Sequence, residues 1–294
     1  MPDKFDAQLD SSAVRRAFNR AAATYDESAV LQREVGERLV ARLQFMQIEP
    51  TRILDLGAGT GYCARLLEAR YRRAQLFLLD PAQALLARAR KHSKRWFSHT
   101  QLLCADAAQS GLADRSIDLI FSNLALHWCG ELLPVFKECR RVLRPGGLLL
   151  FSTLGPSTLQ ELRAAWSALD EDPHVHIFLD MHDIGDALVN SGLSSPILDR
   201  ENLVLTYSEI AGLLRDLKAS GGTNSHQQRK RGLSAHATFA ALGAAYERFR
   251  QHGLLPATYE IVFGHAWAPL AETRPQDGST VATFPFKNLS KRVS

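Results

Sequence analysis

Few cysteines, no long apolar run and little net charge are the first features of this sequence. The four cysteines, at positions 63, 104, 129 and 139, form no Cys-x-x-Cys pair and no other spacing of metal ligands. This pattern predicts reduced, mostly buried thiols and no bound metal. No apolar run reaches the roughly 18 residues that a membrane helix needs. Residues 1–10, M-P-D-K-F-D-A-Q-L-D, also lack the apolar core of a signal peptide. We therefore expect a cytoplasmic protein with no membrane partner.

The balance of charge also limits the partners that the whole surface can attract. A formal net charge of +4 over 294 residues is too low for a polyelectrolyte surface, so any basic surface for a partner must be local. Hydrophobic residues make up 46% of the chain, which is normal for a globular protein with a full core.

The most informative stretch is residues 53–61, I-L-D-L-G-A-G-T-G. A short apolar segment that carries Asp55 leads directly into Gly57, Gly59 and Gly61, and a helix-like segment follows. Glycines in such a turn let the backbone approach a ligand closely. The stretch lacks the Gly-Lys-Ser/Thr of a P-loop, and its third glycine comes too early for the dinucleotide fingerprint. The spacing is typical of motif I in the Rossmann-like methyltransferases that use S-adenosylmethionine (SAM), so we predict that Asp55, Gly57 and Gly59 bind this cofactor.

Polar residues follow three further apolar runs, as they would at the carboxyl ends of parallel strands. Residues 75–79 lead into Asp80, and the interval from Asp55 is 80 − 55 = 25 residues, about one strand-helix-strand unit. An acid at this place accepts hydrogen bonds from ribose hydroxyls. We predict that Asp106 accepts a hydrogen bond from the adenine amino group and that the backbone N–H of Ala107 meets a ring nitrogen. Asn123 ends the next apolar run and is a further predicted cofactor-binding residue. The alternation of strands and helices predicts a parallel sheet with its ligand at this edge.

The rest of the chain completes the predicted sheet. Residues 11–45 are expected to be helical with a break near Tyr25, which either closes over the cofactor or simply packs on the domain. Asp183–Asn190 is an expected helix, Ile197–Thr206 a parallel sixth strand and Tyr259–Trp267 an antiparallel seventh strand.

These elements predict one methyltransferase domain over residues 1–270, followed by a disordered tail at 271–294. The fold class is α/β, with a seven-stranded, mostly parallel sheet, helices on both faces and a helical lid. The expected core comprises residues 50–155, 183–207 and 259–268, and the lid comprises insertions 155–182 and 208–258.

The two insertions carry the candidate residues for the acceptor substrate. Thr158 and Glu161 have the spacing of a capping box at a helix start. Arg163 falls about 40° from Leu159 on that helix at 100° per residue, so it is either a surface arginine with a partly buried stem or a lid residue that faces a substrate anion.

The second insertion contains a basic cluster formed by Arg229, Lys230 and Arg231 together with Arg215 and Lys218. Such a cluster is either a solvated surface or a site that attracts an acidic protein.

The resemblance to a known family extends beyond the SAM motifs, which alone cover residues 50–155. The segments F-N-R-A-A-A-T-Y-D, N-L-A-L-H-W-C, T-L-x-E-L-R-x-A-W and P-A-T-Y-E resemble the malonyl-[acyl-carrier protein] O-methyltransferases of biotin biosynthesis. This resemblance implies SAM-dependent methylation of the free carboxylate of a malonyl thioester, whose methyl ester then primes pimeloyl synthesis. It implies an acidic acyl carrier protein as partner, which we expect to dock at Arg229, Lys230 and Arg231. We expect Arg163 to orient the malonyl carboxylate, and Tyr25 and His127 to line the transfer cavity.

Two alternatives remain open at the level of sequence. A related complex I assembly factor, described as a protein-arginine hydroxylase, shares the E-L-R and P-A-T-Y segments, and small-molecule SAM methyltransferases share the core. Where the malonyl family often has H-V-N, this chain has His174-Val175-His176. Nucleic-acid methylation is disfavoured, because residues 123–126 read N-L-A-L rather than the Asn/Asp-Pro-Pro-Tyr of amino-group methyltransferases.

Overall fold

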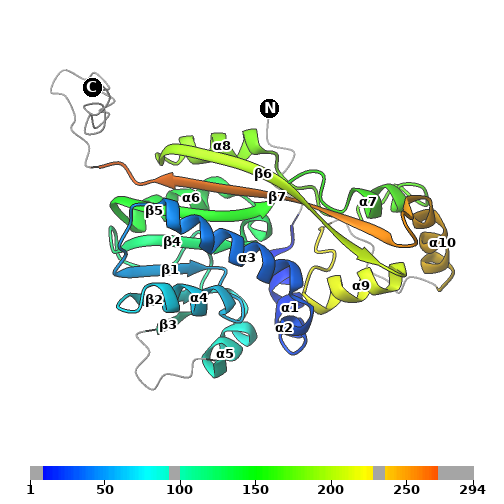
Figure 1. Cartoon of the computed structure of the whole chain (residues 1–294), viewed down its shortest axis with the longest axis horizontal. Helices are drawn as coiled ribbons and strands as arrows, with labels where there is room; N and C mark the ends of the chain where they lie inside the picture. The colour runs from blue at the N-terminus through cyan, green and yellow to red at the C-terminus, as the bar shows by residue number, and fades with distance from the viewer. Residues whose placement is uncertain (1–8, 93–99, 228–235, 271–294) are drawn as a thin grey trace, which may run out of the picture.

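A seven-stranded sheet forms the centre of the protein (Figure 1). The computed structural model describes residues 9–92, 100–227 and 236–270. The strand order is β3-β2-β1-β4-β5-β7-β6, and of the described strands β7 alone runs antiparallel to the other six. The predicted α/β class and mostly parallel sheet are therefore confirmed. The strands are β1 Arg52–Leu56, β2 Gln75–Leu79, β3 Thr100–Leu103, β4 Ile117–Asn123, β5 Leu143–Leu154, β6 Ser194–Tyr207 and β7 Leu255–Trp267.

Helices cover both faces of the sheet because successive strand residues point to opposite sides. Ile53 of β1 belongs to the hydrophobic core under α3 and α4, whereas its neighbour Leu54 belongs to the core under α6 and α8. α5 covers the same face as α3 and α4 through Leu86. These helices are α3 Val30–Arg42, α4 Tyr62–Arg70, α5 Gln83–His92, α6 Leu132–Val142 and α8 Met181–Asn190.

Strands β6 and β7 continue beyond the end of β5 as a two-stranded extension. The pairing of β7 with β5 stops at Ile261, whereas its pairing with β6 continues to Leu255, which lies opposite Tyr207. The extension carries the helical lid, at the right of Figure 1. The lid helices are α7 Gln160–Trp166, α9 Ile210–Ala219 and α10 His236–Tyr246. The hydrophobic core on the α3 side runs on into this lid, so the lid is part of the folded body.

The N-terminal helices are tied to the second insertion. Helix α1 covers Ser11–Ala21 and α2 covers Tyr25–Ser28, so the predicted break beside Tyr25 is confirmed. Thr24 Oγ1 donates a hydrogen bond to the carbonyl of Ala219 at 3.1 Å, and Leu9 forms a β-bridge with His226. These contacts hold α1 and α2 against the end of α9.

The predicted capping box is wrong. Helix α7 begins at Gln160, and its N-cap residue has no side-chain capping bond. Thr158 Oγ1 instead donates to the carbonyl of Glu260 at 3.2 Å, and Glu161 accepts from the backbone N–H of Thr258 at 3.1 Å. The physical reason is that β7 extends past β5, so its exposed backbone edge needs other partners.

Other sequence expectations differ in detail. Strand β7 begins at Leu255 rather than Tyr259, because β6 continues to pair with it. Cys63 and Cys139 are buried and Cys104 is exposed, and all four cysteines are free thiols. Within the described part of the chain, no helix combines the length and the apolar character needed to cross a bilayer. The expected tail at 271–294 lies outside the described residues.

Candidate active site

The glycine turn after β1 forms the floor of the site. Gly57, Gly59 and Gly61 have φ values of +76°, +54° and +76°, a region that favours glycine. A β-carbon at Gly57 would lie 2.2 Å from the β-carbon of Ala125, so this position has no room for a side chain. At Gly59 the nearest atom is 3.9 Å away, in the Tyr25 ring. The backbone at Gly59 is therefore open towards the cavity and faces Tyr25.

Asp80 supports this turn from the end of β2. Its Oδ2 accepts from the N–H of Gly59 at 2.9 Å, and its Oδ1 accepts from the N–H of Ala82 at 2.7 Å. Burial raises the pKa of Asp80 to about 6, although these two N–H groups partly offset the rise. The carboxylate is thus held in one orientation, and its remaining lone pairs are available to a ligand.

Asp55 lies deeper and is the more strongly perturbed acid. Its side chain is buried, and its Oδ2 has no hydrogen-bond partner among the described residues. Burial, followed by the charge of Asp80, raises the pKa of Asp55 to about 7. An unpaired buried carboxylate oxygen is costly without a ligand group beside it.

Asp106 and Ala107 lie on the turn after β3 and line the main cavity. Asp106 Oδ1 accepts from the N–H of Ala108 at 2.8 Å, which fixes the turn. The proposed contact of Asp106 and Ala107 with the adenine ring remains a prediction.

Asn123, at the end of β4, connects the sheet to α3. Its Nδ2 donates to the carbonyl of Gln32 at 2.8 Å, and its Oδ1 accepts from Ser152 Oγ at 2.9 Å. The next residue, Leu124, has φ +48°, which is strained for a leucine. This strain turns the chain sharply, so that the residues after it enter the cavity.

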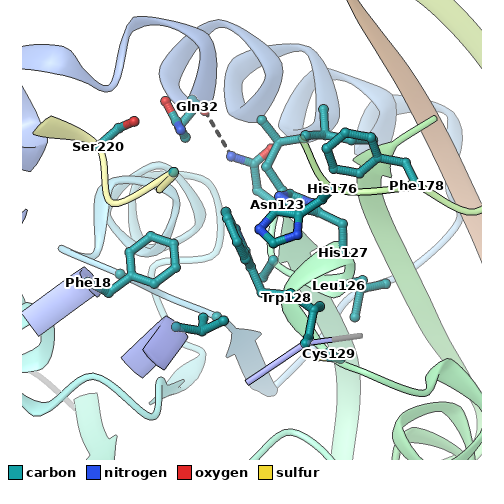
Figure 2. A pocket seen from close by; sticks show the side chains of 18 of the residues that line it. Phe18, Gln32, Asn123, Leu126, His127, Trp128, Cys129, His176, Phe178 and Ser220 are labelled. Carbon is teal, nitrogen blue, oxygen red and sulfur yellow. Dashed lines mark hydrogen bonds between the residues drawn. The ribbon is translucent and has the colours of Figure 1, made fainter. Parts of the chain in front are cut away.

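The main cavity has a volume of about 930 Å³ and extends from the carboxyl edge of the sheet to the lid. An aromatic cluster of Phe18, His127, Trp128, His176 and Phe178 lines it (Figure 2). The ring of Trp128 meets Phe18 and His176 edge-on at centroid distances of 5.3 Å and 5.2 Å. His127 meets Phe178 at 5.8 Å in the same manner.

The two imidazoles of this cluster are held neutral. Burial, with a smaller effect of His176, lowers the pKa of His127 to about 3. Burial also lowers the pKa of His176 to about 4. The Nδ1 atom of His127 is buried without a hydrogen-bond partner in the described part of the chain. At neutral pH the cluster offers uncharged rings and a neutral imidazole edge.

Tyr25 stands between the glycine turn and the aromatic cluster. Its ring lies 6.4 Å from that of Phe18, and it lines the main cavity. Burial, and then the charge of Asp80, raises the pKa of Tyr25 above its ordinary value. Its hydroxyl therefore stays protonated.

A second cavity of about 690 Å³ lies on the other side of the glycine turn. Its charged lining comprises the acids Asp26, Asp55 and Glu68 and the cationic residues Arg33, Arg65 and Lys91. The two cavities share lining residues, which are Tyr25, Gln32, Gly57, Gly59 and Asn123.

Arg163 lies beside the lid segment. Its Nη1 donates to the carbonyl of Pro156 at 3.1 Å, and its Nη2 donates to those of Thr158 at 3.1 Å and His176 at 3.2 Å. It lines a shallow surface groove with Arg248 and is not among the described residues that line the main cavity. Its expected contact with a carboxylate stays a prediction.

Three residues near the lid place metal-ligand atoms together. Ligand atoms of Asp170, Asp172 and His174 lie within 4.8 Å of one another. His174 Nε2 is 2.7 Å from Asp170 Oδ1, and its ring stacks on Trp166 at 3.7 Å. The hydrogen bond and the stacking account for the place of this histidine.

Sequence reasoning missed Phe18, Phe178 and Arg33. Phe18 precedes Tyr25 by seven residues in an alanine-rich stretch, a spacing that would place both on one face of a continuous helix. Phe178 and Arg33 have no comparable signal, because only the tertiary fold brings them to the site.

Comparison with known proteins agrees with this geometry. Residues 54–151 match the family described as Methyltransferase domain. The YcgJ protein of Bacillus subtilis has a similar fold, with a TM-score of 0.58 and 14% identity over 80% of this chain and 99% of that one. The [4+2]-cyclase SpnF has a TM-score of 0.50 at 18% identity, over 81% of this chain and 82% of that one, so the fold alone does not define the reaction.

Curated relatives are similar over nearly the whole chain. The malonyl-[acyl-carrier protein] O-methyltransferase of Laribacter hongkongensis is 48% identical, over 94% of this chain and 96% of that protein. The enzyme of the same name from Methylovorus sp. is 47% identical, over 94% of this chain and 95% of that protein. The similarity includes the lid as well as the sheet. This chain therefore belongs to the malonyl-[acyl-carrier protein] O-methyltransferase family.

Proposed function

We propose that this protein transfers the methyl group of SAM to the free carboxylate of a malonyl thioester carried by acyl carrier protein. The observation that carries the proposal is the 46–48% identity to proteins named for this reaction, over 94–95% of this chain. Because that similarity includes the insertions above the cavity, it favours carboxyl methylation over small-molecule methylation or arginine hydroxylation. We propose further that the product primes pimeloyl synthesis for biotin.

The residues at the sheet edge fit the amino-acid and ribose groups of SAM. Asp55 offers an unpaired buried oxygen, Asp80 is oriented by two backbone N–H groups, and Gly59 leaves the backbone open. When bound, SAM would supply an electrophilic methyl group to the carboxylate oxygen and leave as S-adenosylhomocysteine, which keeps the electron pair of the broken C–S bond.

The acceptor side of the cavity needs to provide position rather than a base. A carboxylic acid normally has a pKa of roughly 4, so the malonyl carboxylate is already ionised at neutral pH. Proximity and alignment of reacting groups supply about 7–11 kcal/mol when the geometry is ideal. The neutral state of His127 suits this task, because its low pKa keeps it uncharged beside the reacting groups.

We assign three residues to the positioning of the acceptor. Tyr25 closes the cavity over Gly59, and His127 lines the transfer site within the aromatic cluster. Arg163 orients the malonyl group. Its bonds to the carbonyls of Thr158 and His176 support an indirect route, in which it fixes the segment that presents His176.

We propose that the acidic carrier protein docks at Arg229, Lys230 and Arg231, which lie outside the described residues. The support is charge: Arg215 and Lys218 are exposed on α9, which contributes Leu217 to the cavity lining. Reversal of Arg229, Lys230 and Arg231 to Glu is expected to weaken turnover of malonyl-carrier protein far more than that of malonyl-N-acetylcysteamine.

Arg70, Arg72 and Arg73 provide a matched control for the docking test. They are exposed near the amino end of β2, at the opposite edge of the sheet from the cavity, and their reversal changes the net charge equally. Equal losses with both thioesters would show that Arg229–Arg231 do not act in docking.

Two measurements test the reaction itself. Purified protein with SAM is expected to release S-adenosylhomocysteine and to form a methyl ester with malonyl-carrier protein, but not with acetyl-carrier protein, which has no free carboxylate. The gene is also expected to restore growth of a biotin auxotroph that lacks this methyltransferase. Soluble protein that neither methylates malonyl-carrier protein nor complements would refute the proposal.

A further inference from the structure

The lid end of the main cavity is lined by one face of the extension of β6 and β7. Tyr207 lies opposite Leu255 near the tip of the extension, and Tyr259 lies opposite Leu203 nearer the sheet. Antiparallel partners and every second residue of a strand point to the same face, so both phenols lie on one face, together with Leu205. Tyr207, Tyr259 and Leu205 all line the cavity.

Helix α9 lies on the other side of this end (Figure 1). The ring of Tyr207 packs on Gly212 of α9, where a β-carbon would lie 3.2 Å from the Tyr207 Cδ1 atom. About one helical turn later, Asp216 accepts a hydrogen bond from the Tyr207 hydroxyl. Burial, and then the charge of Asp216, raises the pKa of Tyr207 above its ordinary value, so the hydroxyl keeps the proton that it donates. The two side chains therefore form one fixed polar group, the Tyr207–Asp216 pair.

The cavity opens to solvent beside this pair. Asp216 is exposed and also lines the cavity, whereas Tyr259 is only 6% exposed. Arg215 and Lys218 are exposed on the same helix. A ligand that enters over α9 therefore passes these cations first, the Tyr207–Asp216 pair next and Tyr259 last.

The groups at this end suit an uncharged chain that carries amides. Leu159 and Leu162 supply apolar wall. The carboxylate of Asp216 has lone pairs beyond the one that Tyr207 uses, so it can accept from an amide N–H, and a phenol hydroxyl can donate to an amide carbonyl. The same carboxylate repels a second anion, so a malonyl carboxylate is directed away from this end and towards the aromatic cluster.

The two polar positions are separated along the extension. Four residues of β7 lie between Tyr259 and the position opposite Tyr207, which is about 14 Å at 3.4 Å per residue. Only a long ligand can contact both. A pantetheine arm is such a ligand, since it carries one amide near the thioester sulfur and a second amide further out.

We propose that the lid end of the main cavity binds the pantetheine arm of the acceptor thioester, with the outer amide at the Tyr207–Asp216 pair and the amide next to the sulfur near Tyr259. This inference rests on the proposed function, because it assigns the arm of that acceptor. The malonyl group then extends beyond Tyr259 to the aromatic cluster, and the exposed cations of α9 lie where the arm leaves the protein. Tyr207 and Asp216 contact the substrate far from the reacting atoms, so they act on its binding.

The test compares two acceptors that differ in the length of the arm. Malonyl-pantetheine has both amides, whereas malonyl-N-acetylcysteamine has only the amide next to the sulfur, and neither requires docking of the carrier protein. With the full chain at saturating SAM, kcat/KM for malonyl-pantetheine is expected to fall about 10-fold in Asp216→Ala and about 5-fold in Tyr207→Phe, through KM. For malonyl-N-acetylcysteamine both variants are expected to stay within about 2-fold of the wild type, which also shows that they are folded.

The pair is tested as a unit by combining the two changes. The double variant is expected to lose no more than Asp216→Ala alone, because both changes remove one interaction. The preference of the wild-type protein for malonyl-pantetheine over malonyl-N-acetylcysteamine is expected to disappear in this variant.

Two controls separate binding of the arm from the stability of the lid. Tyr246→Phe removes a phenol from the same lid, but the Tyr246 hydroxyl donates to the carbonyl of Pro256 at 2.8 Å, and Tyr246 is not among the described residues that line the cavity. It is expected to lower Tm and to change both acceptors equally. Asp186→Ala removes an exposed aspartate from α8, which covers the other face of the sheet, and is expected to change neither acceptor.

The outcomes separate this inference from the proposed function. Equal losses with both acceptors in Asp216→Ala and Tyr207→Phe, or no loss with either acceptor, would overturn the inference. A wild-type protein that uses the two acceptors equally well would overturn it too. In each of these cases methylation of malonyl-carrier protein would still support the proposed function. If the wild-type protein forms no methyl ester with malonyl-carrier protein, the proposed function itself fails.

Discussion

The two halves of the site are built in different ways. The proposed cofactor half consists of Asp55, Gly57, Gly59, Asp80 and Asp106, which lie in β1 or in the turns after β1, β2 and β3. The acceptor half is the aromatic cluster, which combines α1, the segment after β4 and the segment between α7 and α8. In the first half the order of strands fixes the site, and in the second half the packing of distant segments fixes it.

This difference predicts that the two halves respond separately to substitution. The cofactor half depends on backbone N–H groups and carboxylates at the sheet edge. The acceptor half depends on ring contacts and on the lid bonds of Arg163. Changes in one half should therefore alter one substrate and leave the other nearly unchanged.

The largest effect is expected at Asp80. Asp80→Asn keeps the shape of the side chain but presents an amide where two backbone N–H groups and a ligand hydroxyl need acceptors. We expect SAM affinity to fall about 100-fold, measured by titration calorimetry, while KM for the malonyl substrate at saturating SAM changes less than about 3-fold. Asp199→Asn is the control. Asp199 lies on β6 and forms an exposed ion pair with Arg42 of α3. Equal losses of affinity for SAM and for the malonyl substrate would show that the two halves do not act separately.

The next largest effect is expected at Arg163. Arg163→Ala removes three bonds to backbone carbonyls, and we expect kcat/KM for malonyl-carrier protein to fall about 30-fold with SAM affinity unchanged. Arg248→Ala is the control, because Arg248 lines the same groove and donates to the carbonyl of Ala164 at 2.9 Å.

A second measurement on Arg163→Ala distinguishes direct contact from positioning. Direct contact with the carboxylate predicts weaker binding of the malonyl substrate but unchanged binding of its methyl ester, which carries no charge there. Positioning through His176 predicts that both bind more weakly by the same factor. A loss of SAM affinity as large as the loss for malonyl would contradict both.

The cofactor half was predictable because its chemistry is local. Each acid stands directly after or within an apolar run, so Asp55, Asp80 and Asp106 could be assigned to one edge before any packing was known. The seven strands and the antiparallel last strand were also expected from the sequence, whereas the order of the strands in the sheet comes from the structure. The lid was expected above the cavity, and residues of both insertions line it. The supposed capping box at Thr158 is wrong, because β7 extends past β5 and competes for that side chain.

The acceptor half was not predictable in the same way. His127 follows β4 in sequence, but its neighbour Trp128 meets Phe18 and His176, which lie far away along the chain. No pattern in the sequence indicates these pairs. Arg163 was found by its place on a helix, yet its partners are carbonyls of the lid backbone, which no side-chain pattern reveals.

A change of pH is expected to have an intermediate effect, and it should change SAM binding without changing KM for the malonyl substrate. Burial raises the pKa of Asp55 to about 7 and that of Asp80 to about 6. At pH 6 a group with a pKa of 7 is about one-tenth ionised, so SAM affinity should fall about 10-fold between pH 8 and pH 6. His127 and His176, with pKa values of about 3 and 4, do not titrate in this range. KM for the malonyl substrate should therefore stay flat, and Asp55→Asn should reduce the pH dependence of SAM binding.

The same groups should affect stability in the opposite direction. Their raised pKa values mean that the folded protein holds more protons than the unfolded chain between about pH 4 and pH 7. The stability of the ligand-free protein therefore decreases as pH rises through this window. Thermal unfolding with and without SAM, measured from pH 5.5 to pH 8, should show a shift by SAM that grows with pH. A shift by SAM that is independent of pH would contradict the assigned roles of Asp55 and Asp80.

The smallest effect is expected at Glu260, which joins the lid to the sheet extension. Its Oε2 accepts from the N–H of Ser157 at 2.8 Å, and its Oε1 accepts from Arg200 Nη1 at 3.0 Å. Burial alone would raise the pKa of Glu260, but the N–H of Ser157 and then Arg200 outweigh it and lower the value. Glu260→Gln keeps an oxygen that accepts from the N–H of Ser157, but its NH2 group cannot accept from Arg200, so that bond is lost. We expect the free energy of unfolding to fall by about 1 kcal/mol, which would lower Tm by about 2–4 °C. SAM affinity should be unchanged, and kcat/KM for malonyl-carrier protein should fall less than about 3-fold.

Glu201→Gln is the control for Glu260→Gln. Glu201 lies on β6 and forms a more exposed ion pair with Arg38 of α3. A loss of SAM affinity in Glu260→Gln would show that the lid also shapes the cofactor half, and the two halves would then act as one unit.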